Sequence, residues 1–245
     1  MKNSYKISEM RFLLLLICFS LIPLAYSEVN IETQDLQLEY GLAYHTLRGR
    51  QEANESKGRL TSPQFPYFVG AYTFRTTQNT AFRLFGGVQT VQFDEPPFGT
   101  TISEKQALVQ YGGELVRKLG PIMKLGVFGM KQDHPLYVTV RPDEFEVIRV
   151  SFAQTGLHFS LGQRRRIGLL WGLGAKAYAL FPTKGGNFLT ETGGGGEGYA
   201  RLGWIGPLGT AVHFKGFYQV STAPNAEVTF THEVLGYSVS FQYSF

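Results

Sequence analysis

The sequence predicts an all-β fold, a transmembrane antiparallel up-and-down β-barrel of about ten strands. Three observations predict it. The end of the chain alternates strictly between large apolar and small or polar side chains. The interior segment 167–181 alternates in the same way over a length that suits a membrane-crossing strand. The 29 glycines and the 14% aromatic content suit closely packed strands with aromatic belts better than helices.

Residues 1–27 have the pattern of a secretory signal peptide. Three basic residues precede the apolar run 12–25, and Ala25-Tyr26-Ser27 places small residues at the positions that a signal peptidase reads. The apolar run is shorter than the about 20 residues that a membrane-spanning helix needs. We therefore exclude this segment from the fold and predict that residues 28–245 form a single barrel domain.

The only cysteine, Cys18, lies inside the apolar run of the signal. No small residue directly precedes it, so we interpret it as part of the run; a lipid attachment site is the alternative. Without this segment the chain has no thiol. Neither disulfides nor thiolate metal sites are therefore expected to stabilise it.

The C-terminal residues carry the most informative pattern. From Leu235 onward the odd positions are large and apolar and the even positions are small or polar, as in a strand with one apolar face. The aromatic residues on that face are Tyr237, Phe241, Tyr243 and Phe245. This ending resembles the C-terminal strand signal of bacterial outer-membrane β-barrel proteins, which their assembly machinery recognises. The alternative is the edge strand of a soluble sheet.

The resemblance covers only the last strand and names a class rather than a protein. It implies an integral protein in the outer membrane of a Gram-negative-type cell. The expected partners are outer-membrane lipid and the barrel assembly machinery, the latter bound through the C-terminal strand.

Two kinds of connection separate the predicted strands. Short ones lie near 76–79, 118–121, 163–166 and 205–207. Longer polar ones lie near 47–64, 94–104, 132–144, 182–197 and 221–229. Because such barrels keep short turns in the periplasm and long loops outside, the alternation predicts ten strands with both termini periplasmic.

Two of the long connections have distinctive sequences. Leu136, Val138 and Val140 could form a further strand within 132–152, so twelve strands is the alternative count. The segment 182–197, which contains four consecutive glycines, is expected to be a mobile surface loop.

Charge and hydropathy narrow the class of protein. The formal net charge is +4, and the signal contributes +2 of it, which argues against a nucleic-acid partner. Mean hydropathy is slightly negative, as expected for a barrel that hides every second residue from lipid. A soluble lipocalin-like barrel is the alternative architecture, but it would not be expected to use Gly, Ser and Gln for one whole face of its strands.

The polar face of the predicted strands carries charged side chains of both signs. The candidate lumen-lining residues are Glu39, His45, Glu114, Lys124, Lys176, Arg201, His213 and Lys215. In a narrow lumen such groups can pair and fill the interior, or they can line a narrow, mildly cationic pore. The predicted function is therefore a non-enzymatic barrel that acts as a narrow pore or as a surface structural protein.

The pair His158 and Ser160 is the weak catalytic candidate. It resembles the His-x-Ser of outer-membrane lipid A deacylases, which implies a lipid-directed hydrolase as the alternative function. An imidazole on the same strand face can accept the serine proton. However, Leu161 and Gly162 follow where that family has a polar continuation, and the next predicted strand, 167–181, supplies no carboxylate to orient the histidine.

Other signals are weak. Arg164, Arg165 and Arg166 form a basic patch expected at the periplasmic rim, where it is either solvated or holds phosphate groups or a partner. The five histidines show no metal-ligand spacing, and no Gly-rich phosphate loop or nucleophile elbow is found. We predict no metal and no cofactor.

Overall fold

A computed structural model describes most of the chain after residue 33. The described residues are 34–51, 57–93, 105–141, 144–164, 167–183, 191–225 and 228–245. The predicted signal peptide, Cys18, the predicted loop 94–104 and the pair Arg165 and Arg166 lie outside these ranges. Among the described residues, no helix is long and apolar enough to cross a membrane.

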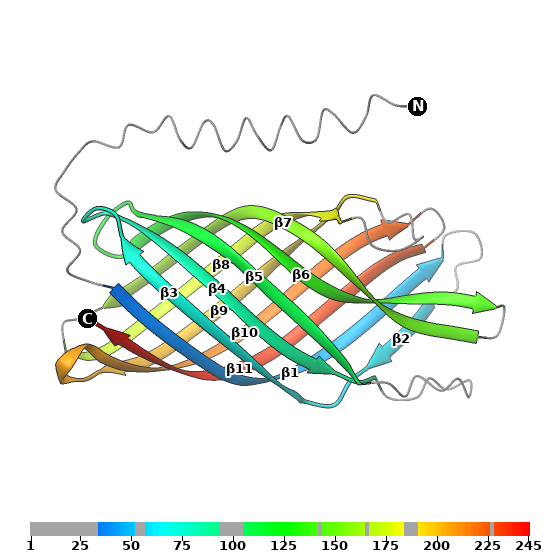
Figure 1. The fold of residues 1–245 in the computed structure, drawn as a ribbon, viewed down its shortest axis with the longest axis horizontal. Helices are drawn as coiled ribbons and strands as arrows, with labels where there is room; N and C mark the ends of the chain where they lie inside the picture. Colours follow the sequence, from blue (N-terminus) through cyan, green and yellow to red (C-terminus); the bar gives the residue numbers. More distant parts are fainter. Residues whose placement is uncertain are drawn as a thin grey trace, which may run out of the picture. The chain divides into compact units, whose positions relative to one another are not determined.

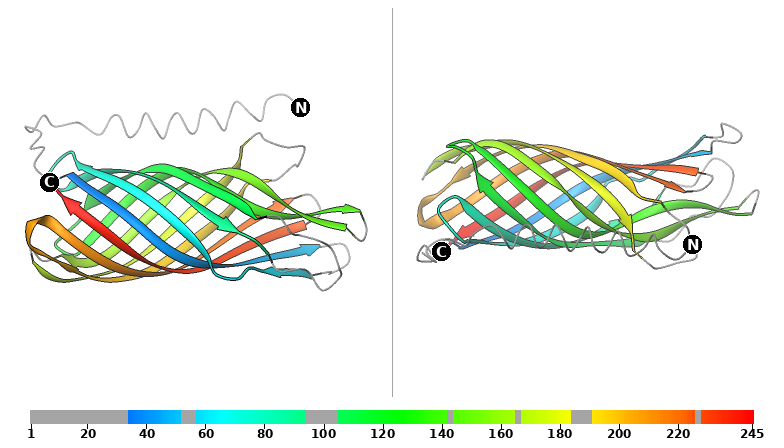
Figure 2. Two further views of the ribbon diagram at one scale, coloured as in Figure 1. Left: turned by 60° about the horizontal axis from the view of Figure 1, so that its bottom comes forward. Right: turned by 90° about the horizontal axis from the view of Figure 1, so that it is seen from above.

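The described residues form one closed antiparallel barrel (Figure 1). Its strands are β1 (Gln34–Gln51), β2 (Lys57–Thr61), β3 (Phe65–Arg75), β4 (Thr80–Val91), β5 (Gln106–Lys118), β6 (Met123–Arg141), β7 (Glu144–Arg164), β8 (Gly168–Pro182), β9 (Gly193–Ile205), β10 (Thr210–Asn225) and β11 (Val228–Ser244). The only helical element of these ranges is the short turn η1 (Pro207–Gly209). Two further views show the same tilted strands passing around the barrel (Figure 2).

The barrel closes through β1. This strand pairs with β11 from Asp35↔Ser244 to Gln51↔Val228, which joins the two ends of the sheet. On its other side β1 pairs first with β3 and then with β2, so these two short strands together occupy one position in the barrel. The count of ten strands is therefore confirmed.

Several strands are longer than the sequence predicts. β6 and β7 take up most of the predicted loop 132–144, so Leu136, Val138 and Val140 extend β6 instead of forming a further strand. In the same way, β1 and β2 enter the predicted loop 47–64, and β10 and β11 enter the predicted loop 221–229.

The prediction of a mobile loop over 182–197 is wrong for residues 193–197, which belong to β9. Gly193–Gly196 are the first residues of β9, where they pair with β8 and β10. A Cβ on Gly195 would lie 2.6 Å from the Tyr178 ring, so the glycine provides the space in which that ring lies. Residues 184–190 lie outside the described ranges.

A change of pattern along β1 explains why the predicted strand was shorter than the observed one. In the first half of β1 the outward side chains Leu38 and Tyr40 are apolar and exposed, whereas later Arg48 is exposed and Leu47 is buried. The apolar face thus changes from the outside of the barrel to the inside, without a break in pairing. The alternation that marks a lipid-facing strand is lost there, although the strand continues.

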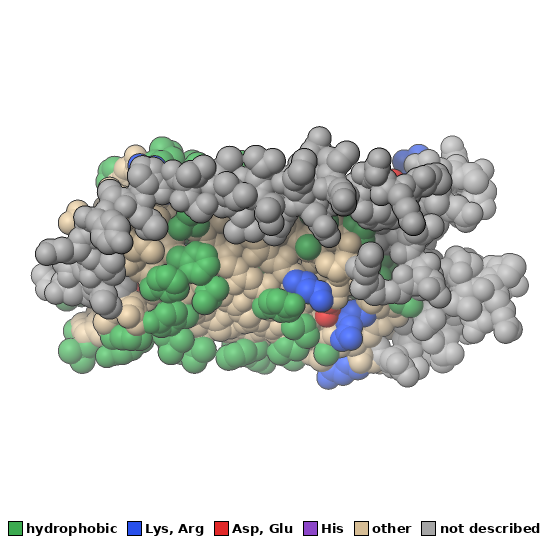
Figure 3. Space-filling view, turned by 45° about the horizontal axis from the view of Figure 1, so that its top comes forward, with side chains coloured by type: hydrophobic (Ala, Val, Ile, Leu, Met, Phe, Trp, Pro, Cys, Tyr) green, Lys and Arg blue, Asp and Glu red, His purple; other side chains and the backbone are tan. Residues whose placement is uncertain are grey.

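The membrane-type half of the barrel has the predicted orientation of side chains. Leu157 and Leu173 are 57% and 53% exposed, whereas residues of the opposite parity, such as His158, are buried. Figure 3 shows hydrophobic side chains on the left part of the visible barrel wall and a group of Lys and Arg side chains to the right of its centre.

Two apolar clusters fill the interior of the other half. The first contains Phe128, Leu136, Val150, Phe152, Tyr178, Leu180, Ala223 and Phe230. The second contains Leu47, Leu60, Val91, Phe93, Leu108 and Val147. Because their members come from strands around most of the barrel, we call them together the apolar layer.

Candidate functional site

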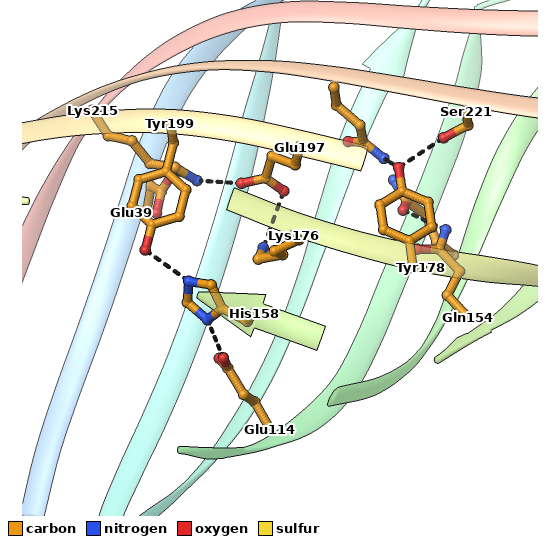
Figure 4. Close-up of polar contacts among 12 residues, drawn as sticks. Glu39, Glu114, Gln154, His158, Lys176, Tyr178, Glu197, Tyr199, Lys215 and Ser221 are labelled. Atoms are coloured by element: carbon orange, nitrogen blue, oxygen red, sulfur yellow. Dashed lines mark hydrogen bonds and ion pairs between the residues drawn. The ribbon is translucent and has the colours of Figure 1, made fainter. Parts of the chain in front are cut away.

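The centre of the barrel contains a network of paired charges. Lys176 on β8 donates a hydrogen bond to Glu197 on β9 over 3.0 Å, and Lys215 on β10 lies 3.5 Å from the other oxygen of Glu197. Lys215 also lies 3.9 Å from Glu39 on β1. Glu39 accepts further hydrogen bonds from Tyr67 (2.9 Å) and Ser238 (2.8 Å). Figure 4 shows part of this charged network, which connects side chains of β8, β9, β10 and β1.

His158 lies at the centre of a second set of contacts (Figure 4). Its Nδ1 contacts the carboxylate of Glu114 on β5, and its Nε2 lies 2.8 Å from the Tyr199 hydroxyl on β9. His158 itself is on β7, so each partner must reach across an intervening strand. The result is a carboxylate–imidazole–phenol array that uses both imidazole nitrogens.

Two glycines on the intervening strands make this reach possible. Gly126 is paired with His158, and a Cβ there would lie 2.7 Å from Glu114 Oε1. On β8, Gly174 is paired with Tyr199, and a Cβ there would overlap the Tyr199 ring. Side chains at either position would separate His158 from a partner, so these glycines determine the geometry of the array.

Ser160 is not part of the array. Like His158 it is buried and on the interior face, because pairing of β7 with both neighbours continues without a register shift from Phe152 to Leu161. β7 therefore has no bulge at 154–156 that would exchange its faces. In contrast, His158 does have an orienting carboxylate, which the sequence analysis expected to be absent. It is Glu114, which lies two strands away on β5 and not on the next strand along the chain.

The other predicted lumen residues lie on the same face of their strands. Lys124 is half-buried near the start of β6, and His213 is buried near the start of β10. Arg201 is half-buried on β9 and lies over Gly172, whose Cβ would be 2.7 Å from its Nε. Arg83, also on this face, donates a 3.2 Å hydrogen bond to Gln37.

His45 belongs to a separate array of three histidines. Its Nδ1 lies 2.8 Å from His232 Nε2, and His232 Nδ1 lies 3.3 Å from His134 Nδ1. Glutamine amides end the array, with Gln89 at His45 and Gln154 at His134 (2.8 Å). All three imidazoles are buried next to the apolar layer.

The histidine array does not form a metal centre. His232 uses opposite ring nitrogens for its two neighbours, so the three side chains do not converge on one point. Within the described ranges, no group of three or more His, Cys, Asp or Glu side chains is arranged to hold a metal ion.

Several interior residues were missed by the sequence analysis. Glu197 and His134 lie within segments predicted to be loops, and Tyr199 lies two residues after the end of one of them. Tyr67 was not considered because aromatic residues were assigned to the lipid face. The parity of the strands, extended through the predicted loops, was the signal that could have found them.

The C-terminal aromatic residues all point outward. Tyr237, Phe241, Tyr243 and Phe245 are each at least half exposed, and the rings of the last two stack with centroids 5.7 Å apart. The backbone of Phe245 exchanges two 2.9 Å hydrogen bonds with Gln34, which joins the ends of the barrel.

The fold is similar to that of solved outer-membrane proteins. The outer membrane protease OmpT from Escherichia coli aligns with 91% of this chain and 100% of its own, with a TM-score of 0.54 and 8% identity. An outer membrane channel from Pseudomonas putida F1 covers 90% of this chain and 98% of its own, at 10% identity and a TM-score of 0.46. No protein-family model matches the sequence, and the search of curated proteins finds no match.

At this low identity the likeness concerns the fold alone. The chain is a closed ten-stranded antiparallel barrel of the outer-membrane type.

Proposed function

We propose that the protein is a non-enzymatic barrel of the outer membrane whose lumen is closed by its own side chains. Its role is that of a surface structural protein rather than an open pore. The observation that carries this proposal is the apolar layer: Leu47, Val91, Phe152 and Leu180, from four different strands, are each at most 1% exposed. Ions do not cross a dry, close-packed layer, because moving a charge into an apolar medium is costly.

The charged network supports the same conclusion for the centre of the barrel. Glu197 lies between Lys176 and Lys215, and Glu39 is bound by Lys215, Tyr67 and Ser238. The charged side chains of this network thus bind one another, as in an interior that is filled by ionic ladders. Liposomes that contain the refolded protein and are loaded with sucrose should therefore retain it. Release at the rate of a general porin would contradict the closed lumen.

For the location we propose the outer membrane, with outer-membrane lipid along the exposed apolar wall and both termini in the periplasm. The longest strands then project beyond the outer surface, and the short turn 76–79 lies inside. Chain assembly would depend on the machinery that reads the aromatic C-terminal strand.

Thiol labelling of intact cells tests the location and the orientation together. The predicted mature chain has no cysteine, so single cysteines can be placed at Asn225, at a long-strand end, and at Gln78, exposed in the turn. A bulky maleimide should label the first position on intact cells and the second only after the outer membrane is permeabilised. The reverse pattern would overturn the orientation, and a protein in the soluble fraction would overturn the location.

The lipid-directed hydrolase is disfavoured by the contacts of His158. Both imidazole nitrogens are occupied by Glu114 and Tyr199, and Ser160 lies on the interior face, away from lipid. Purified barrel incubated with lipid A should release no acyl chain above the level of Ser160→Ala. Release that disappears in this variant would make the protein an enzyme.

A further inference from the structure

The barrel encloses a cavity of about 110 Å³ between the charged network and the histidine array. Its lining includes Glu39, Glu197 and Lys215 from the network, and Gln89 and Gln154, which end the histidine array. A cavity needs about 10 to 15 Å³ to hold one water molecule, so this one holds several waters or one small molecule. It is smaller than the pockets that bind drug-sized ligands.

Five glutamines supply most of the uncharged polar groups of the cavity. They are Gln89, Gln110, Gln132, Gln154 and Gln219, from five different strands. An amide offers both donors and acceptors, so the five together can bond a molecule that also carries both.

Hydrogen bonds to neighbouring side chains hold several of these amides in place. Gln154 donates to Gln132 over 2.8 Å and also contacts His134, and Gln219 donates to the Tyr178 hydroxyl over 2.9 Å. Gln110 differs, because its amide has no hydrogen-bond partner among the described residues although it is half-buried. Polar groups that neighbouring side chains hold in place, beside an amide that faces the cavity, can bond a ligand with little rearrangement.

The formal charges of the lining balance. Three carboxylates, Glu39, Glu114 and Glu197, face three cationic groups, Arg83, Lys176 and Lys215. An anion would compete with the carboxylates for these cations, and a cation would compete with the cations for the carboxylates. The lining therefore selects a neutral molecule.

The rest of the lining is apolar. It consists of Val69, Phe85, Phe128, Met130, Phe217 and Val234, together with the ring faces of Tyr67 and Tyr178. These apolar residues share strands with the glutamines, for example Phe85 with Gln89 on β4 and Phe217 with Gln219 on β10. Water gains no hydrogen bonds from the apolar side chains, whereas the C–H groups of a carbon chain can pack against them. A molecule that carries both hydroxyl and C–H groups matches this mixed lining.

We propose that this cavity is a binding site for a small neutral polyhydroxylated molecule, of about the size of glycerol to a five-carbon sugar alcohol. The glutamines bond its hydroxyl groups, and the aromatic and aliphatic side chains pack against its carbon atoms. This site is distinct from the proposed closed lumen, since binding requires neither conduction nor a particular membrane.

Isothermal titration of the refolded barrel in detergent micelles with ribitol tests the site, with ribonate as the carboxylate of similar size. We expect saturable one-to-one binding of ribitol and at least tenfold weaker binding of ribonate. The double substitution Gln110→Ala and Gln132→Ala removes two amides and should weaken ribitol binding about tenfold or more. Gln163→Ala, at an exposed position of β7, is the matched control and should leave binding unchanged.

Heat-modifiable migration confirms that each variant is folded before titration. Absence of saturable ribitol binding by the folded wild-type barrel would mean that the cavity holds only water, and would overturn the proposal. Equal binding by the double variant, or equal binding of ribonate, would also overturn it. Because the measurement is made in micelles, its outcome is independent of the location and closure tests.

Discussion

At the scale of single residues, the interior depends on the positions that lack a side chain. Gly126 on β6 and Gly174 on β8, the two strands that flank β7, leave the space through which Glu114 and Tyr199 reach His158. The array therefore depends on what two neighbouring strands omit as much as on the three groups it joins. A sequence search for charged or nucleophilic side chains does not identify these two glycines.

A substitution at Gly174 tests this dependence. Gly174→Ala should lower the free energy of unfolding by about 1 to 3 kcal/mol, because the added methyl group overlaps the Tyr199 ring and the ring must move. Denaturant titration of the barrel in lipid vesicles measures the loss. Gly198→Ala is the matched control on β9, since its Cβ would meet nothing within 4 Å. A Gly174 variant as stable as this control would show that Tyr199 is not held there.

Leu173 and Lys176 on β8 test the assignment of faces. Leu173→Arg should cost about 2 to 4 kcal/mol of unfolding free energy if the residue lies at the bilayer midplane, because its side chain is exposed on the barrel wall and would face lipid there. Lys176→Gln should cost less, since Glu197 keeps Lys215 as a partner. The same vesicle titration compares them. Equal tolerance of the two changes would mean that the strand phase or the membrane assignment is wrong.

For the two catalytic candidates, the sequence predicts the orientation of the side chains but not their contacts. The interior orientation of His158 and Ser160 followed from strand parity, and the structure confirms it. The partner of His158 did not follow, because Glu114 is 44 residues away in sequence and approaches through a gap left by a glycine. Parity is a local property, whereas contacts across the lumen depend on the register of several strands.

At the scale of elements, the halves of the strands with exposed apolar side chains were predictable, and the halves beyond them were not. Large apolar side chains alternate with small or polar ones only where one face contacts lipid. Beyond that zone Leu47 and Phe152 face inward and Arg48 and Arg149 face outward, so the pattern reverses within a continuous strand. For this reason the sequence predicts a loop over 132–144, where the structure has the paired ends of β6 and β7.

The last strand, β11, provides a test at this scale. Deletion of Phe245 removes both backbone hydrogen bonds to Gln34 and the outermost ring of the aromatic pair. We expect a lower yield of folded, heat-modifiable barrel in the outer-membrane fraction of cells. Phe245→Trp keeps the backbone and an aromatic ring and is the control. Assembly of the deletion variant at the wild-type level would remove the case for a C-terminal assembly signal.

At the scale of the whole molecule, the interior is divided into layers of different chemistry. The charged network, the cavity with its five glutamines, and the apolar layer with the histidine array involve nearly every strand of the barrel. The ten-stranded architecture was predictable from alternation and connection lengths. The layers were not, because each one combines residues from segments far apart in the sequence.

Single-channel recording in a planar lipid bilayer tests the closed lumen most directly. The refolded wild-type barrel, shown by heat-modifiable migration to be folded, is added to bilayers in which an open porin gives steady current under the same conditions. Because we propose that the apolar layer closes the lumen to ions, we expect no steady current from this protein. A uniform, long-lived conductance step that recurs with each insertion would contradict the closed lumen and would make the protein a pore.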